Sequence, residues 1–222
     1  QDAEIRHRIA ETARVLVQNT GFDGIHYDVE PLFDEDLDFI SLLEETRTKI
    51  GSGHVISVAL REMIPDFIGK MLSYWLDLDA FNDPSFYQEI AKKSDQIVIM
   101  TYENTIRKPW LYRYFVKNEV IWVTRALADT GAKILIGLPT YDTPSETFYP
   151  EAENLENGLL GVVDGLNNWR SDGENFSGVA LFRFGTTSAI EWEIFEKLFH
   201  FSPLGTLPPP RTLPFYETQL SQ

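Results

Sequence analysis

Five short apolar runs alternate with amphipathic helical patterns, and this alternation limits the folds open to the chain. The runs are rich in β-branched and aromatic residues and predict strands at residues 22–30, 54–60, 96–102, 133–139 and 177–185. Helical periodicity predicts helices at residues 3–18, 34–50, 64–93, 110–131, 159–169 and 189–201. Apolar strands that alternate with amphipathic helices are typical of a parallel sheet covered by helices.

Two architectures fit this pattern: an open doubly wound sheet, or part of a (β/α)8 barrel. No glycine-rich phosphate turn follows any predicted strand, which argues against a nucleotide-binding open sheet. Carboxylates and aromatic residues instead gather at the carboxyl ends of the strands, where barrel enzymes build their sites. The proline-rich residues 202–222 lack periodicity and predict an extended tail, so residues 1–201 are expected to form the barrel portion.

Charge and composition exclude several classes of partner. The formal net charge of the 222 residues is −15, and no Lys/Arg-rich run offsets it, so the chain should repel nucleic acids and anionic lipid surfaces. No apolar run approaches the roughly 20 residues that would insert across a bilayer. The chain has no cysteine, and its His, Asp and Glu residues lack metal-ligand spacing, so no metal or other cofactor is expected. A cysteine-free chain suits a secreted or cell-envelope protein, but many cytosolic proteins also lack cysteine.

The segment GFDGIHYDVEP, residues 21–31, places polar groups at every second position of a predicted strand. Strand alternation puts His26, Asp28 and Glu30 on one face, which in a barrel is the inner face. Glu30 comes last, nearest the carboxyl end of the strand. We expect the like charge of Asp28, together with partial burial, to favour the protonated form of Glu30 near neutral pH. A protonated carboxyl at that position is suited to act as a general acid.

Four segments also resemble a known family. DGIHYDVE (23–30) resembles the DGxDxDxE signature on the fourth strand of glycoside hydrolase family 18, the chitinase-like (β/α)8 barrels. IVIMTYE (97–103), KILIGLPTYD (133–142) and GVALFRF (178–184) resemble segments of strands six, seven and eight, in the same order. The resemblance implies a TIM barrel of which this chain carries strands 4 to 8. The three preceding βα units would be absent, or supplied by the same precursor or by another chain.

The resemblance also implies a chemistry. The family hydrolyses β-linked N-acetylhexosamine glycans, of the chitin or peptidoglycan type, by substrate-assisted retaining catalysis. Glu30 matches the general acid/base, Asp28 the group that orients the 2-acetamido group, and Tyr102 the tyrosine that hydrogen-bonds to it. Ordinary retaining glycosidases on barrels use a second glutamate on strand seven, and LIGLPTYD contains none, which favours the substrate-assisted route.

Three positions depart from the family pattern. His26 stands where the family has the middle aspartate of its signature, Glu103 where it commonly has aspartate, and Phe182 where a tryptophan forms the floor under the sugar. His26 and Phe182 favour an alternative function, a non-catalytic carbohydrate-binding barrel, whereas the intact Glu30 favours an enzyme. His26 itself is either a site residue or a hydrogen-bonded core histidine. The candidates for contact with the sugar are Asp23, His26, Met100, Glu103, Trp110, Tyr141 and Phe182.

Overall fold

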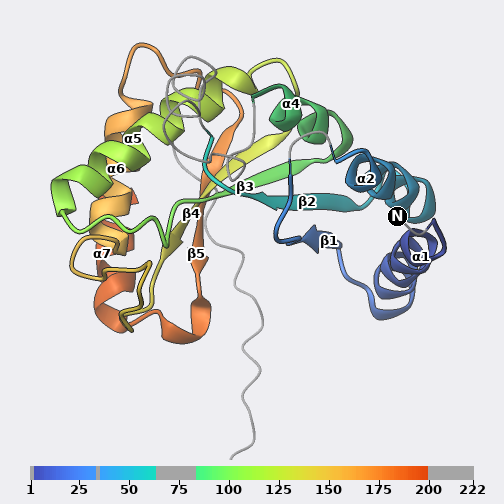
Figure 1. Ribbon diagram of the computed structural model, residues 1–222, viewed down its shortest axis with the longest axis horizontal. Helices are drawn as coiled ribbons and strands as arrows, with labels where there is room; N and C mark the ends of the chain where they lie inside the picture. The colour runs from blue at the N-terminus through green and yellow to red at the C-terminus, as the bar shows by residue number, and fades with distance from the viewer. Residues whose placement is uncertain (1–2, 34–35, 64–83, 200–222) are drawn as a thin grey trace, which may run out of the picture.

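The computed structural model describes residues 3–33, 36–63 and 84–199, which contain one parallel sheet of five strands. The strands lie side by side in the order in which they occur along the chain (Figure 1). They are β1 (Gly24–Tyr27), β2 (Val55–Leu60), β3 (Gln96–Met100), β4 (Lys133–Pro139) and β5 (Phe176–Phe182). Sequential order is that of a barrel wall, whereas a doubly wound sheet reverses its order at a switch point. The prediction of a parallel α/β sheet is therefore confirmed.

The helices form an arc around one side of the sheet in Figure 1. Of those in the described residues, four connect successive strands, one precedes β1 and one follows β5. They are α1 (Ala3–Thr20), α2 (Leu37–Ile50), α4 (Pro84–Lys93), α5 (Pro109–Ala126), α6 (Leu155–Leu166) and α7 (Ala189–Phe199), with a short 3-10 turn at Phe184–Thr186. They cover the outward face of the sheet. Alternate strand residues such as Ile56, Ile97 and Ile134 point to this face and are fully buried under the helices. No helix in the described residues is long and apolar enough to cross a membrane.

Several element boundaries differ from the predicted ones. The first strand ends at Tyr27 instead of residue 30, so Asp28 and Glu30 lie beyond the ladder. Helix α5 ends at Ala126, where the N–H of Leu127 donates to the Val123 carbonyl. Helix α6 begins earlier than predicted, because the side chain of Asn154 caps it. Residues 64–83 of the predicted helix 64–93, and the predicted tail 202–222, lie outside the described residues.

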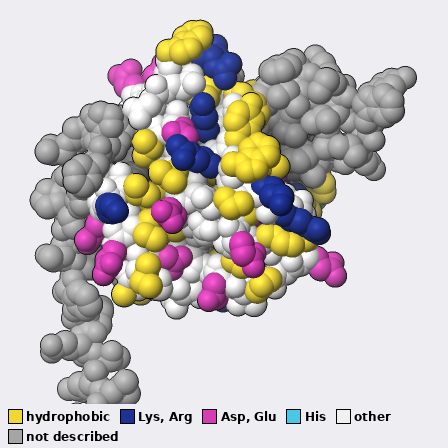
Figure 2. All heavy atoms as spheres, turned by 90° about the vertical axis from the view of Figure 1, so that its left-hand side faces the viewer, with side chains coloured by type: hydrophobic (Ala, Val, Ile, Leu, Met, Phe, Trp, Pro, Cys, Tyr) yellow, Lys and Arg dark blue, Asp and Glu magenta, His cyan; other side chains and the backbone are white. Residues whose placement is uncertain are grey.

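The sheet is open at both edges within the described residues. There, β1 pairs with β2 alone and β5 pairs with β4 alone, so five strands do not close a barrel. Large apolar side chains near both edges remain exposed, among them Ile5, Phe22, Phe184 and Ile190. Figure 2 shows the side that carries α5, α6 and α7, where apolar side chains are interspersed with charges of both signs.

Helices α5 and α6 approach closely because glycines of α6 face α5. A Cβ atom at Gly165 would lie 2.6 Å from Cβ of Val120 and 2.9 Å from the carbonyl oxygen of Lys117. Gly161 faces the Arg113 carbonyl in the same way, at 2.8 Å. The absence of side chains at these positions sets the distance between the two helices, and through them the position of the loops after β3 and β4.

Gly165→Ala should lower the free energy of unfolding by about 1–3 kcal/mol, because the added methyl group overlaps α5 backbone. Alanine is intrinsically the better helix former, so a loss of stability would report the clash itself. Urea denaturation followed by circular dichroism measures it. Gly53→Ala is the matched control, because a Cβ there meets nothing within 4 Å. Equal stability of the two variants would contradict the close helix packing.

Candidate functional site

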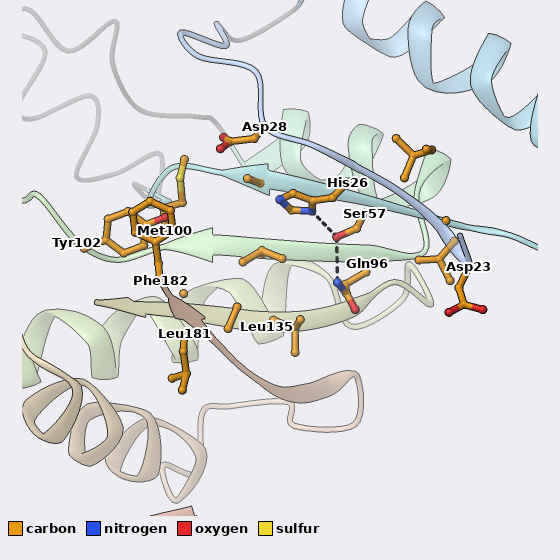
Figure 3. A pocket seen from close by; sticks show the side chains of 17 residues that line it. Asp23, His26, Asp28, Ser57, Gln96, Met100, Tyr102, Leu135, Leu181 and Phe182 are labelled. Atoms are coloured by element: carbon orange, nitrogen blue, oxygen red, sulfur yellow. Dashed lines mark hydrogen bonds between the residues drawn. The ribbon is translucent and has the colours of Figure 1, made fainter. Parts of the chain in front are cut away.

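The inner face of the sheet forms an open groove of about 620 Å³. Residues of all five strands line it. In the three inner strands β2, β3 and β4 the lining residues alternate, because strand side chains point in and out with a period of two. Figure 3 shows this groove, with Asp23 at one end and Asp28, Met100, Tyr102 and Phe182 towards the other. The second group lies at the carboxyl ends of the strands.

Three aromatic rings meet at the carboxyl end of the groove, and we call them the aromatic platform: Tyr102, Tyr141 and Phe182. The rings of Tyr102 and Phe182 stack with centroids 4.9 Å apart and planes 7° apart. Tyr141 meets both edge-on, at 6.4 Å from Tyr102 and 6.0 Å from Phe182. Each of the three follows or ends a different strand, β3, β4 or β5, so the sheet itself brings them together.

Negative charges surround the phenol of Tyr102. Burial raises the pKa of Tyr102, and the charges of Asp28, Glu30 and Glu103 raise it further. The phenol therefore stays protonated at neutral pH and can donate a hydrogen bond. The structure brings Asp28 and Tyr102 together in the groove.

Glu30 is exposed rather than partly buried, and it does not line the groove. The reason is that β1 ends at Tyr27, so Glu30 no longer follows the alternation of the strand. Its charge nevertheless acts on two groups, the phenol of Tyr102 and the carboxyl of Glu62 after β2. Burial is the main cause of the raised pKa of Glu62, and Glu30 adds to it. Glu30 therefore lies near the carboxyl ends of both β2 and β3.

His26 joins a polar row across the floor of the groove. Its Nδ1 lies 2.8 Å from Oγ of Ser57, and Nε2 of Gln96 donates to the same oxygen at 2.9 Å. The ladder register explains the row, because His26 pairs with Ser57 and Ser57 with Gln96. The imidazole thus bonds to Ser57, and no hydrogen bond joins it to Asp28. By its surface area His26 is exposed, but the side of its ring that faces Ser57 is partly buried, which lowers the pKa of His26, and the charge of Asp28 opposes this.

Of the remaining predicted residues, Met100 and Glu103 lie near Tyr102, whereas Asp23 and Trp110 lie away from it. Met100 lines the groove beside Tyr102, and the carboxylate of Glu103 accepts a hydrogen bond from the Tyr141 hydroxyl at 3.2 Å. Asp23 lies at the opposite end, where its carbonyl accepts the N–H of Val55 at 2.9 Å, so its backbone extends the pairing of β1 with β2. Trp110 is 68% exposed in the first turn of α5 and does not line the groove.

Sequence reasoning missed Ser57, Gln96 and Glu62. Ser57 is a polar residue within an apolar run, and Gln96 stands at the start of another. These positions could have marked both residues as candidates for the inner face of the sheet. Their partnership with His26 needs the register between strands, which a single sequence does not reveal. In the described residues, no group of three or more His, Asp or Glu side chains is arranged to hold a metal ion.

Comparison with solved structures finds proteins that share this architecture. No family model and no curated protein matches the chain. Among solved structures, a class V chitinase from Pseudomonas fluorescens matches with a TM-score of 0.60 and 12% identity, over 90% of this chain and 73% of that one. A chitinase of glycoside hydrolase family 18 from Pseudoalteromonas aurantia matches with a TM-score of 0.59 and 15% identity, over 89% of this chain and 67% of that one.

The spore cortex-lytic enzyme SleL of Bacillus cereus matches with a TM-score of 0.55 and 14% identity, over 87% of this chain and 53% of that one. The chain thus has the fold of a (β/α) barrel wall. More narrowly, it has a divergent glycoside hydrolase family 18-like fold. Identities of 12–15% show the fold alone, so activity and substrate are a separate question.

The imidazole of His26 should titrate below 6.5 in a proton NMR experiment, since burial disfavours its charged form. Its contribution to folding is full above about pH 6.5 and is lost as pH falls through the lower folded-state pKa. His26→Asn, which retains a hydrogen-bonding group near Ser57, should therefore lose less stability between about pH 7.5 and 5.5 than the wild type. A His26 pKa at or above 6.5 would contradict this environment.

Proposed function

We propose that this chain is part of a glycoside hydrolase that acts on β-linked N-acetylhexosamine glycans, of the chitin or peptidoglycan type, by substrate-assisted retaining catalysis. The observation that carries the proposal is that Asp28 and Tyr102 line one groove beside the aromatic platform, at the carboxyl ends of the strands. Glu30 lies outside the groove, three residues after the end of β1. The fold shared with chitinases and SleL supports the same class of reaction.

The proposed reaction assigns one task to each of three side chains. Glu30 protonates the glycosidic oxygen as the bond from that oxygen to the anomeric carbon breaks. The acetamido oxygen of the same sugar attacks the anomeric carbon and forms an oxazolinium ion, whose positive charge the carboxylate of Asp28 stabilises. Tyr102, whose phenol stays protonated, donates to the acetamido group and orients it. Glu30 then takes a proton from water, which opens the ion with net retention of configuration.

The five strands of this chain form only part of the barrel that would enclose the proposed site. We infer that three further βα units, from the same precursor or another chain, pair with β1 and β5 and close an eight-stranded barrel. Both open edges and the exposed apolar side chains near them support this inference. The similar structures are also longer, since this chain covers 73%, 67% and 53% of their lengths.

In the chain by itself, amides of β1 and β5 should exchange with solvent faster than those of β3, because edge strands leave half of their N–H groups without a ladder partner. In the longer polypeptide or complex that contains the three units, exchange at β1 and β5 should slow by about tenfold or more. Hydrogen exchange read by mass spectrometry measures both. The amides of β3, paired on both sides, are the internal control. Unchanged exchange at both edges would contradict closure.

Glu30→Gln in that longer form should lower the rate of chitotetraose or peptidoglycan hydrolysis by about 10²–10⁴-fold, because the amide cannot transfer the proton. Glu89→Gln, an exposed glutamate on α4, is the matched control and should retain full activity. Product formation is followed by mass spectrometry. Equal turnover by the Glu30→Gln variant and the wild type would overturn the catalytic assignment.

Two observations favour a second candidate, a non-catalytic carbohydrate-binding protein. The side chain of β1 two residues before Asp28 is His26, which bonds to Ser57, so β1 supplies no carboxylic acid at this position to share a proton with Asp28. One face of the Phe182 ring is also covered by Tyr102, which reduces the surface available for a sugar. Calorimetry decides between the candidates. A binding protein would bind chitotetraose with equal affinity before and after Glu30→Gln, and neither form would release product.

A further inference from the structure

A buried carboxylate that the proposed reaction does not use lies directly before α6. Glu153 is fully buried, with 0% of its surface exposed. Its Oε1 accepts the backbone N–H of Ile106 at 2.8 Å, and its Oε2 accepts that of Asn104 at 3.2 Å. Both donors belong to the loop of residues 103–108, which begins directly after Tyr102 and leads into α5. One carboxylate from the β4–α6 connection therefore binds two amides of the β3–α5 loop.

The loop has a conformation that needs such support. Glu103 has φ of 65° and Thr105 has φ of 59°, in the left-handed region that residues with a Cβ atom rarely adopt. These two residues alternate with Asn104 and Ile106, whose N–H groups point to Glu153. A third bond, from the N–H of Thr105 to the Thr147 carbonyl at 2.8 Å, comes from the same β4–α6 connection.

The loop carries a side chain of the candidate site. The Glu103 carboxylate accepts a hydrogen bond from the hydroxyl of Tyr141 at 3.2 Å, and its charge adds to the raised pKa of Tyr102. Tyr141 in turn packs edge-on against Tyr102 and Phe182. The backbone conformation at Glu103 therefore sets where a negative charge stands at the rim of the aromatic platform.

We propose that Glu153 is a positioning residue, which holds the 103–108 loop in its left-handed conformation and so places Glu103 at the rim of the groove. The ionised carboxylate suits the task because both of its oxygens accept, and hydrogen bonds to a charged acceptor are the strong ones. Burial raises the pKa of Glu153, and the bonds from the Ile106 and Asn104 N–H groups oppose this by favouring the ionised form. A glutamine of the same shape has one accepting oxygen, and its NH2 group would face the second N–H. The part that concerns the glycan rests on the proposed function, whereas the loop geometry does not.

The first test is amide exchange in Glu153→Gln, read by mass spectrometry on peptides that cover the 103–108 loop. Loss of one of two charge-assisted bonds should speed exchange of these amides by about tenfold, with β2 and α1 unchanged. Glu151→Gln is the matched control, two residues away and exposed, and should leave the loop as in the wild type. Unchanged exchange in the loop, or equal acceleration over the whole chain, would overturn the proposal.

A second measurement needs no variant, and it decides the matter if Glu153→Gln fails to fold. In the wild type, the amide protons of Asn104 and Ile106 should shift with pH together with the side-chain carboxyl carbon of Glu153. The carboxyl of Glu103, the other acid whose charge acts on Glu153, is followed separately by its own carbon signal. The amide of Thr105, which donates to a carbonyl, should not follow the Glu153 signal. If the chemical shifts of the Asn104 and Ile106 amide protons do not change with the titration of Glu153, the proposal is overturned.

A third arm separates this inference from the proposed function. If the longer, active form hydrolyses chitotetraose, Glu153→Gln should raise KM about three- to tenfold and change kcat by less, because Glu103 acts at the rim and not on the scissile bond. An equal fall in kcat with unchanged KM would overturn the placement of Glu103. A wild type that neither binds nor hydrolyses the glycan defeats the proposed function alone, since the exchange and NMR results still decide the role of Glu153.

Discussion

The parallel ladder between consecutive strands is the interaction on which the rest of the structure depends. Because β1 to β5 pair in chain order, every second side chain of each strand faces the same side of the sheet. One set, which includes Ile56 and Ile97, is buried under the helices, while the other lines the open groove. The same register aligns His26, Ser57 and Gln96 in a row and brings the strand ends with Asp28, Tyr102 and Phe182 to one end of the groove.

The site departs from a simple pair of acids on one strand. His26 turns to its ladder neighbour, and Glu30 stands outside the groove, exposed, near the carboxyl ends of β2 and β3. Further acids lie beyond the strands: Glu62 follows β2, Glu103 follows β3, and Glu153 accepts hydrogen bonds from the loop on which Glu103 lies. The electrostatics of the groove thus depend as much on loop conformation as on strand alternation.

Most of the architecture could be predicted from the sequence, because apolar periodicity is a local property. All five strands were located within a few residues, and the order of the motifs indicated the fold that the solved chitinases share. That these strands are numbers 4 to 8 of a barrel stays a prediction. Of the candidate site residues, Asp28, Met100, Tyr102 and Phe182 meet in the groove, whereas Asp23 and Trp110 lie apart from its carboxyl end.

The sequence by itself determined which segments are strands, which faces are apolar and where acidic and aromatic side chains are concentrated. It could not determine which side chains become partners, because partnership depends on register and on loops that no local pattern encodes. The bond of His26 to Ser57 follows from the pairing of β1 with β2, and the end of β1 at Tyr27 releases Glu30 from the inner face. Glu153 reaches Asn104 and Ile106 across almost 50 residues of chain, a contact that only close packing of two βα units creates.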